Sequence, residues 1–389
     1  MLPLDLAPLT DAERAHEARV RRCIAEAIER AGGWLPFQEF MRLALYAPGL
    51  GYYAAGAHKL GAGGDFVTAP ELSPVFGRCV ATQCADVLSQ LEGGDLIEIG
   101  AGTGALAEQV LLTLDSLGVL PTRYRILEIS PDLRERQHER LCGLPESLYR
   151  RVEWLDAPPQ DPCQGIILAN EVIDALPVTR LRGSKEGPEV LGVSMSADRV
   201  VEAARPASPA EVARLGEMAI TLEMNQEIEW CPYLPQWLES ITSFLSRGVV
   251  LFFDYGESRR HLYTPDRPRG TLVAFHRHRI HNDPYRHLGL QDLTAWVDFT
   301  AVAEAAVAAA FGVAGYTTQS CFLLACGFEA HLQEWRESLS PDEAALAPRK
   351  ALKLVLPDDM GARFKCMALA RNFEGALRGF SLRDFTATL

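Results

Sequence analysis

The sequence predicts an α/β fold built on a mostly parallel sheet of seven strands, and three observations lead to this prediction. From residue 95 onward, short apolar runs alternate with helical stretches, which is typical of strands joined by crossover helices. These runs are nearly continuous in Ile, Leu and Val, as expected for strands that are covered on both faces. The chain has 389 residues, of which 48% are hydrophobic, so it can bury a sizeable core and is not intrinsically disordered.

A helical extension, residues 1–92, precedes the first predicted strand. Its apolar periodicity predicts helices at 11–31, 36–46 and 74–91. Between the second and third helix lies a glycine-rich segment, 49–74. Compact domains rarely keep so long an irregular segment without a use for it, so we expect this loop to serve a functional site.

The sheet and its insertions follow. The predicted strands are 95–99, 124–129, 151–155, 165–169, 249–254, 314–318 and 363–371. The predicted helices between them are 104–117, 131–142, 301–311 and 328–337. These elements assign the core to 93–177, 248–255 and 300–389, and leave 178–247 and 256–299 as two insertions that form a separate lobe. The first insertion is expected to contain strands near 189–204 and helices at 209–218 and 233–246.

The strongest motif is EIGAGTG, residues 98–104, which closes the first strand and opens a helix. Glycines there let the backbone turn tightly and approach a ligand, and the helix N-terminus offers free N–H donors. The motif fits a dinucleotide, whose pyrophosphate would lie on the helix N-terminus, or S-adenosylmethionine (SAM), whose ammonium could pair with Glu98. A tight turn without a ligand is the third alternative. The candidate cofactor-binding residues are Glu98, Gly100, Gly102, Gly104 and, for the ribose hydroxyls, Glu128 at the end of the second strand.

Polar side chains also follow the fourth strand. Asn170, Glu171 and Asp174 leave the carboxyl end of that strand, which is where open α/β sheets bind their ligands. If the segment forms a helical turn, Glu171 and Asp174 point the same way and could together orient a nitrogen nucleophile. The alternative is that Asp174 only anchors the turn before Pro177 and that Glu171 alone takes part in the chemistry. We therefore name Glu171, Asp174 and Asn170 as the candidate catalytic residues.

These segments make the chain resemble a known family. The strings that carry the resemblance are GYY (51–53), GDFVTAPELSPVFG (64–77), EIGAGTGALA (98–107), EISPDLRERQ (128–137), NEVIDALPV (170–178) and FFDYG (252–256). They are similar to the MidA-like family of class I SAM-dependent methyltransferases, which have a Rossmann-like sheet of seven strands. Mitochondrial members assist assembly of respiratory complex I by methylating an arginine of one subunit.

The resemblance implies an activity and further site residues. It implies SAM as the cofactor, a protein-arginine acceptor, an antiparallel last strand at 363–371, and an acceptor lobe built from the two insertions. The residues implied to cover or contact the cofactor are Asp65, Phe66, Thr68, Pro70, Glu71 and Ile129. Two alternatives remain: an assembly factor that binds SAM without turnover, and an NAD-dependent oxidoreductase.

The second insertion is unusually basic, because 258–287 contains seven arginines and five of the nine histidines. Four interpretations compete. His276, His278 and His281 could bind a metal, although nearby acidic ligands are missing. The segment could face RNA, or order against an acidic partner as part of the acceptor lobe, or be a solvated loop with His278 or His281 hydrogen-bonded inside.

Charge and cysteine usage limit the partners. The net charge of −13 argues against general nucleic-acid binding. The nine cysteines contain no CxxC pair, which predicts buried, reduced thiols and no metal site. The N-terminus lacks a leader pattern and no apolar run is long enough for a membrane span, so we expect a bacterial, cytoplasmic protein without membrane insertion. We expect a protein substrate, and a homodimer is compatible with the sequence.

Overall fold

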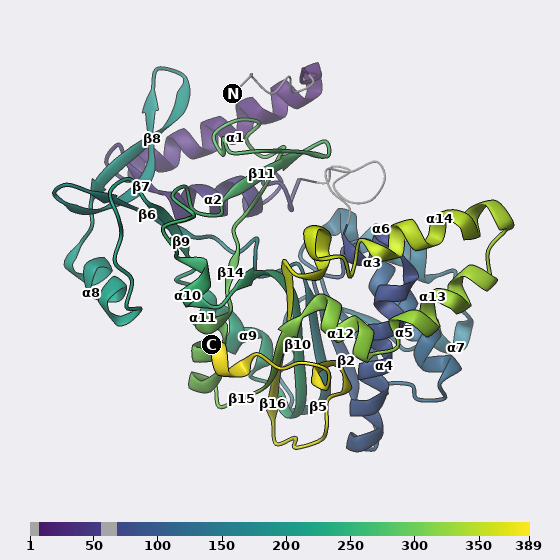
Figure 1. Cartoon of the computed structure of the whole chain (residues 1–389). Coiled ribbons are helices and arrows are strands. Elements are labelled where there is room, and N and C mark those ends of the chain that lie inside the picture. Colours follow the sequence, from purple (N-terminus) through teal and green to yellow (C-terminus); the bar gives the residue numbers. More distant parts are fainter. Residues whose placement is uncertain (1–7, 56–67) are drawn as a thin grey trace.

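A computed structural model describes residues 8–55 and 68–389, and its main feature is one large sheet flanked by helices (Figure 1). Along the sheet the order is β15 (Gly312–Thr318), β16 (Phe364–Arg371), β10 (Leu245–Glu257), β5 (Cys163–Asn170), β2 (Asp95–Ile99), β3 (Tyr124–Leu127) and β4 (Val152–Leu155). The five strands from β10 to β4 are parallel, and β16 lies antiparallel to both β10 and β15. The predicted α/β class and the antiparallel last strand are thus confirmed.

The strand count differs from the prediction. The sheet has eight strands rather than seven, because β14 (Val297–Asp298) pairs in parallel with Gly256 and Glu257 of β10. Strand β10 is longer than expected and continues to Glu257, which leaves an edge beyond the main ladder for β14 to join. It also begins earlier than expected, at Leu245, so the helix predicted at 233–246 ends at Thr242.

Helices cover both faces of this sheet, as the continuous apolar strands predicted. Leu251 and Phe253 of β10 pack in one cluster, whereas Val250 and Phe252 pack in a second cluster on the opposite face. The first cluster includes α4 (Pro74–Leu91), α5 (Ala105–Ser116), α12 (Gln319–Ala325) and α13 (Phe328–Glu337). The second includes α9 (Leu234–Thr242) and α11 (Phe299–Ala308). The remaining helices on the core are α3 (Ala69–Leu72), α6 (Pro131–Leu141), α7 (Glu146–Tyr149) and α14 (Pro341–Leu352).

The N-terminal helices and most of the two insertions share a second lobe, in the upper left of Figure 1, whereas α9 and β14 of the insertions belong to the core. The second lobe contains α1 (Asp11–Arg30), β1 (Leu35–Pro36), α2 (Phe37–Tyr46), β6 (Thr179–Ser184), β7 (Gly187–Ser196), β8 (Arg199–Pro206), α8 (Pro209–Glu217) and β9 (Glu227–Trp230). Because β1 pairs with β7, the start of the chain completes the sheet of the first insertion. The second insertion adds α10 (Arg259–Leu262), β11 (Val273–His276), β12 (Arg279–His281) and β13 (Asp292–Thr294). Helix α4, by contrast, packs on the core.

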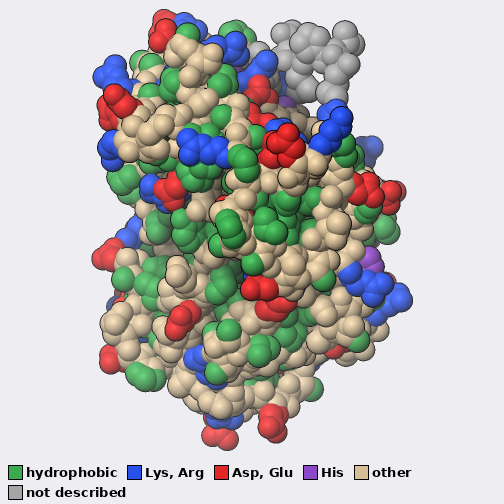
Figure 2. Space-filling model, turned by 90° about the vertical axis from the view of Figure 1, so that its left-hand side faces the viewer, with side chains coloured by type: hydrophobic (Ala, Val, Ile, Leu, Met, Phe, Trp, Pro, Cys, Tyr) green, Lys and Arg blue, Asp and Glu red, His purple; other side chains and the backbone are tan. Residues whose placement is uncertain are grey.

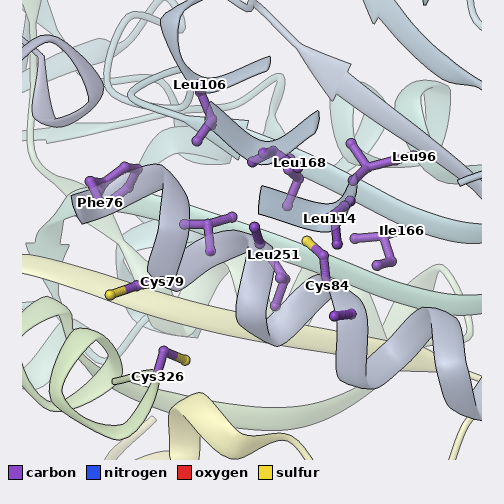
Figure 3. Packing of buried hydrophobic residues seen from close by; sticks show 14 of the residues in the cluster. Phe76, Cys79, Cys84, Leu96, Leu106, Leu114, Ile166, Leu168, Leu251 and Cys326 are labelled. Carbon is purple, nitrogen blue, oxygen red and sulfur yellow. The ribbon is translucent and has the colours of Figure 1, made fainter. Parts of the chain in front are cut away.

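All nine cysteines are free thiols, in line with the prediction that they are reduced. Cys79, Cys84 and Cys326 lie in the apolar core among side chains such as Leu251 (Figure 3). Burial raises the pKa of the Cys84 thiol, which makes it unreactive. The expectation of burial does not hold for every cysteine, because Cys142 is exposed.

In the described ranges, no helix combines the length and the apolar character that a membrane crossing requires.

Candidate functional site

The glycine segment between β2 and α5 forms a tight connection that only glycine adopts easily. Gly100, Gly102 and Gly104 have φ angles of 65°, 54° and 81°, in the left-handed region. A Cβ atom on Gly104 would lie 3.4 Å from the Cα atom of Gln137, so this glycine allows α6 to pack closely. Gly100 and Gly102, in contrast, line a cavity. The segment thus has one glycine for packing and two that face a ligand space.

This cavity of about 710 Å³ lies where the sheet meets the second lobe. Its floor is the glycine segment and the ends of β3 and β5, and its other walls come from α2 and α9. The polar candidates Glu98, Glu128, Asn170 and Glu171 all line it. Ligand sites of drug-sized molecules occupy about 300–1,000 Å³, so the cavity is large enough for a cofactor and part of an acceptor.

Glu98 brings a buried carboxyl group to the floor of the cavity. It is 2% exposed, and Oε2 accepts a hydrogen bond of 2.7 Å from the Tyr124 hydroxyl. Burial raises the pKa of Glu98 to about 7, despite the opposing effect of this hydrogen bond. A cationic ammonium in the cavity would stabilise the carboxylate, which is the role that the sequence predicts for this residue.

Glu128 is held rigidly at the end of β3. Its Oε1 accepts a hydrogen bond from the backbone N–H of Ser130 at 2.9 Å, and its Oε2 accepts one from Gln137 Nε2 at 3.1 Å. Gln137 also donates to the carbonyl of Gly102 at 2.8 Å, which ties the glycine segment to the same carboxylate. Ile129 lines the cavity beside it and is 69% exposed, so it offers an apolar surface to a flat ligand group. The arrangement fits a ribose and its base.

The predicted covering segment divides into residues with different positions. Thr68 and Pro70 line the cavity. Glu71 instead accepts a hydrogen bond from the Thr103 hydroxyl and pairs with Arg140 at 3.3 Å, so it anchors the segment to the glycine connection rather than facing the cavity. Asp65 and Phe66 lie outside the described residues.

Glu171 is the most unusual residue of the site. Its φ angle is +54°, which is uncommon for a residue with a side chain. Its Oε1 accepts hydrogen bonds from the backbone N–H of Ala69 at 3.4 Å and from Asn170 Nδ2 at 3.2 Å. Burial, and secondly the nearby Asp174 carboxylate, raise the pKa of Glu171 to about 8. Within the described part of the chain, both hydrogen bonds to the Glu171 carboxyl group end on Oε1, which leaves Oε2 for a ligand.

The helical turn considered for 170–176 does not form, and this changes the position of Asp174. The backbone of Glu171 lies in the left-handed region, so Glu171 and Asp174 are not neighbours on one face of a helix. Asp174 is buried beneath the turn, and burial raises its pKa to about 6 against the lowering effect of the Tyr255 hydroxyl. Its backbone carbonyl accepts a hydrogen bond of 3.0 Å from Ala295, in the second insertion. Asn170 and Glu171 line the cavity, whereas Asp174 supports the turn.

Sequence reasoning missed the residue that shapes this turn, Asp254. Its Oδ2 accepts hydrogen bonds from three successive backbone N–H groups, those of Val172 at 3.2 Å, Ile173 at 2.9 Å and Asp174 at 3.3 Å. Such a concave set of N–H groups is a binding site for an anion, here supplied by the protein itself. Asp254, in the string FFDYG, directly follows the part of β10 that pairs with β5. Its place at the end of a predicted strand could have indicated that it belongs to the site.

Two tyrosines of the N-terminal extension were also missed. Tyr46 and Tyr53 line the cavity, and their rings stack with centroids 5.5 Å apart. Tyr46 donates a hydrogen bond of 2.9 Å to the carbonyl of Ala175, directly after the Glu171 turn. The GYY string contained Tyr53, but nothing in the spacing indicated that both rings reach the strand end of a distant domain.

The basic insertion is structured by contacts within the chain. Arg277 pairs with Glu13 at 2.6 Å and Arg259 with Asp298 at 3.0 Å, so these charges are compensated internally. His276 is buried, with Nδ1 2.7 Å from the carbonyl oxygen of Leu290, and His281 is also buried. His278 instead occupies a left-handed position in the β11–β12 turn. Metal binding by these histidines therefore does not match the structure. The solvated-loop interpretation, with His281 hydrogen-bonded inside, fits it better: the Asp283 N–H donates to His281 Nδ1 at 3.3 Å, while Arg269 and Arg279 are exposed.

The possible metal ligands and the molecular surface lead to the same conclusion about metal and RNA binding. Across residues 8–55 and 68–389, no three His, Cys, Asp or Glu side chains form a group that could hold a metal ion. On the face shown in Figure 2, the described basic and acidic side chains are interspersed around hydrophobic ones. A continuous basic surface, as expected for RNA binding, is not seen among the described side chains of that face.

Comparison with known proteins decides between the cofactors that fit this cavity. The profile of a family described as "Putative S-adenosyl-L-methionine-dependent methyltransferase" matches residues 79–317, which include the glycine segment and the Glu171 turn. The chain belongs to this family. SAM is therefore its cofactor, and the resemblance that the sequence motifs indicated is confirmed.

Solved structures and characterised relatives agree with this assignment. A COG1565 superfamily protein of Burkholderia thailandensis, solved with S-adenosyl-homocysteine bound, is 38% identical, with a TM-score of 0.93 over 99% of this methyltransferase and 100% of that chain. A relative from Drosophila melanogaster named protein arginine methyltransferase NDUFAF7 homolog, mitochondrial, is 29% identical over 94% of this chain and 87% of its own. The Danio rerio protein arginine methyltransferase NDUFAF7, mitochondrial, is 28% identical over 86% and 83%. The NAD-dependent oxidoreductase alternative is set aside.

Proposed function

We propose that this methyltransferase transfers a methyl group from SAM to an arginine side chain of a protein, with a respiratory-complex subunit as the first candidate. The relatives from Drosophila melanogaster and Danio rerio are named protein arginine methyltransferases, and they align over most of both chains. The observation that carries the proposal is Glu171: a half-buried carboxyl group that lines the cavity beyond the cofactor-binding residues and has one oxygen held by hydrogen bonds and the other left for a ligand.

A carboxylate at this position answers the chemical difficulty of an arginine acceptor. The guanidinium stays protonated at physiological pH, so its nitrogen lone pairs are delocalised and react poorly. Glu171 would hold the guanidinium plane by accepting its N–H groups, which localises positive charge away from the attacking nitrogen. When bound, SAM supplies a methyl group on a positively charged sulfur. As the new N–C bond forms and the C–S bond breaks, the attacking nitrogen loses a proton, and Glu171 is placed to accept it.

The protein around Glu171 keeps this carboxylate in place. The turn that follows it is held by Asp254 from below, and by Tyr46 and Ala295 from the second lobe. Asn170 Nδ2 and the Ala69 N–H fix Oε1. Because these contacts come from both lobes, the reactive carboxylate is positioned only when the lobes are together.

The test is Glu171→Gln, which keeps the shape of the side chain and removes its charge. We expect nearly unchanged binding of SAM by calorimetry, and a loss of methyl transfer of about 10²-fold or more, the scale of a positioned electrostatic or acid–base group. Transfer is measured by mass spectrometry on the complex I subunits of the same organism. Glu108→Gln is the matched control, because Glu108 pairs with Arg140 on the surface and does not line the cavity.

Two outcomes would contradict the proposal. Full activity of Glu171→Gln would remove this residue from the mechanism. Failure of the wild-type protein on every arginine acceptor, with SAM still bound, would favour the assembly factor without turnover. A cytoplasmic location and a homodimer stay predictions from the sequence.

A further inference from the structure

The cavity wall beyond the cofactor-binding residues carries four oxygen-bearing side chains from separate parts of the chain. Tyr46 comes from α2 and Tyr53 from the segment after it, whereas Asn170 and Glu171 lie at the end of β5. The tyrosine rings are stacked at an interplanar angle of 20°, and so form one surface opposite the strand end. The helical extension thereby contributes directly to the space in which an acceptor would lie.

Both tyrosine hydroxyls donate a hydrogen bond to another group of the protein. Tyr46 donates to the carbonyl of Ala175 at 2.9 Å, and Tyr53 donates to Asp292 Oδ2 at 2.8 Å. Burial raises the pKa of both hydroxyls well above its ordinary value, so they stay protonated at neutral pH. A hydroxyl that has donated its only hydrogen can still accept through its lone pairs.

The strand-end residues have the same polarity. Asn170 Nδ2 donates one hydrogen bond to Glu171 Oε1 at 3.2 Å. Its Oδ1 is buried and accepts no hydrogen bond from the described part of the chain. A buried oxygen without a donor costs free energy, unless a ligand supplies one. The two tyrosine hydroxyls therefore present acceptor lone pairs with their only donors engaged elsewhere, and the Glu171 carboxyl adds acceptor oxygens once it has lost its proton.

From this polarity we infer that Tyr46 and Tyr53 are specificity-determining residues that accept hydrogen bonds from the guanidinium of the acceptor, together with Asn170 and Glu171. This inference rests on the proposed arginine acceptor. A guanidinium has five N–H donors in a plane and no acceptor atom, so it matches the lone pairs of the two tyrosine hydroxyls and the deprotonated Glu171 carboxylate. A ligand with a carbonyl oxygen in the same place would bring its lone pairs against those of the tyrosine oxygens. This repulsion would weaken its binding.

The test uses fragments that isolate the end of the acceptor side chain. The full-length protein, saturated with S-adenosyl-homocysteine, is titrated calorimetrically with n-butylguanidinium, n-butylammonium and n-butylurea. The urea has the shape of the guanidinium but replaces one nitrogen by a carbonyl oxygen and has no charge. We expect the guanidinium to bind most tightly and the urea most weakly.

Tyr46→Phe and Tyr53→Phe then remove one acceptor oxygen each and keep the rings. We expect each variant to bind S-adenosyl-homocysteine within about twofold of wild type and n-butylguanidinium about tenfold more weakly, the scale of a hydrogen bond to a cation. Tyr285→Phe is the matched control. It removes a hydroxyl from the same lobe, where Tyr285 packs on Phe40 and bonds to Arg180, but this residue does not line the cavity.

The outcomes separate the inference from the proposed function. If wild type binds n-butylguanidinium and both Phe variants bind it equally well, the inference is wrong and the arginine acceptor stands. Equal binding of the guanidinium and the urea would also overturn the inference. If wild type with S-adenosyl-homocysteine bound takes up no guanidinium at all, the arginine acceptor itself is contradicted.

Discussion

Glu171 combines three features that each oppose folding. Its backbone is left-handed, its half-buried carboxyl group is partly removed from water, and the nearby Asp174 carboxylate adds repulsion. Residues in such conformations persist only where surrounding contacts impose them, and they concentrate at functional sites. At the residue scale, this strain is therefore consistent with a role in the reaction rather than in stability.

The raised pKa of Glu171 predicts an acid limb in the rate profile. The free enzyme must lose the Glu171 proton before the carboxylate can accept a guanidinium, and its pKa is about 8. We expect kcat/KM for the arginine acceptor to rise with pH up to about 8 and then level off, because this parameter reports the free enzyme. In kcat the inflection should lie at lower pH, since a bound cation stabilises the carboxylate. A kcat/KM that is constant between pH 6 and 9 would contradict this prediction.

Glu128 allows a prediction about the cofactor alone. Its carboxylate is held by Ser130 and Gln137, so it is oriented before the cofactor arrives. We expect Glu128→Ala to weaken SAM binding by about 1.5–3 kcal/mol, the scale of a pair of charge-assisted hydrogen bonds. Calorimetric titration measures the change, with Glu108→Gln as control. An unchanged dissociation constant would place the ribose contact elsewhere.

At the scale of elements, two connections make the site. One joins β2 to α5 through three left-handed glycines, and the other follows β5 and is shaped by the Asp254 carboxylate. Each connection leaves the carboxyl end of a parallel strand, and β2 and β5 are neighbours in the sheet. The topology of the sheet thus brings the cofactor-binding segment next to the acceptor-binding turn.

Gly102→Val tests the first connection. A Val side chain at φ 54° would be strained and would project at the cavity, so we expect loss of SAM binding together with about 1–3 kcal/mol of unfolding free energy. Gly118→Val is the matched control, because Gly118 has a φ of +68° and no atom within 4 Å of its added Cβ. Chemical denaturation should show a similar loss of stability in both variants, and calorimetry a loss of binding only in Gly102→Val. Normal binding by Gly102→Val would mean that this glycine is merely structural.

At the scale of the whole molecule, buried carboxyl groups make stability depend on pH. Glu98 and Glu171 have pKa values of about 7 and 8 in the folded protein, above their ordinary value of 4.5. For a raised carboxyl pKa the folded state holds more protons than the unfolded state, so stability is lost as pH rises from about 4.5 to 8. The cofactor-free protein should therefore melt at lower temperature at pH 8.5 than at pH 6.

Glu171→Gln should make this decline shallower, because a neutral side chain has no proton to lose. Thermal melts between pH 5 and 9 measure the effect. Glu13→Gln is the control: the pKa of Glu13 is lowered to about 2, so its removal should leave the slope in this range unchanged. A decline as steep in Glu171→Gln as in wild type would show that other groups cause it.

The sequence by itself determined the seven strands of the main ladder, most of the helices beside them, and the segment that binds the cofactor. The continuous apolar strands and the EIGAGTG segment are recognised from local features. These features are the spacing of apolar residues, the glycines of a tight turn and the start of a helix, and none of them depends on distant residues. It also determined that Glu171 leaves the fourth strand. It could not determine the conformation of the turn, because the hydrogen bonds that shape it come from Asp254, about eighty residues later in the chain.

Only the tertiary structure decided which side chains share the cavity. It separated Glu71 and Asp174, which support the site, from Thr68 and Glu171, which line it. It also brought Tyr46 and Tyr53 of the N-terminal extension to the end of β5. The physical reason is that the tyrosine contacts join segments more than a hundred residues apart through the packing of the two lobes. Hydrophobic periodicity indicates that a side chain is buried, but not which partner it packs against.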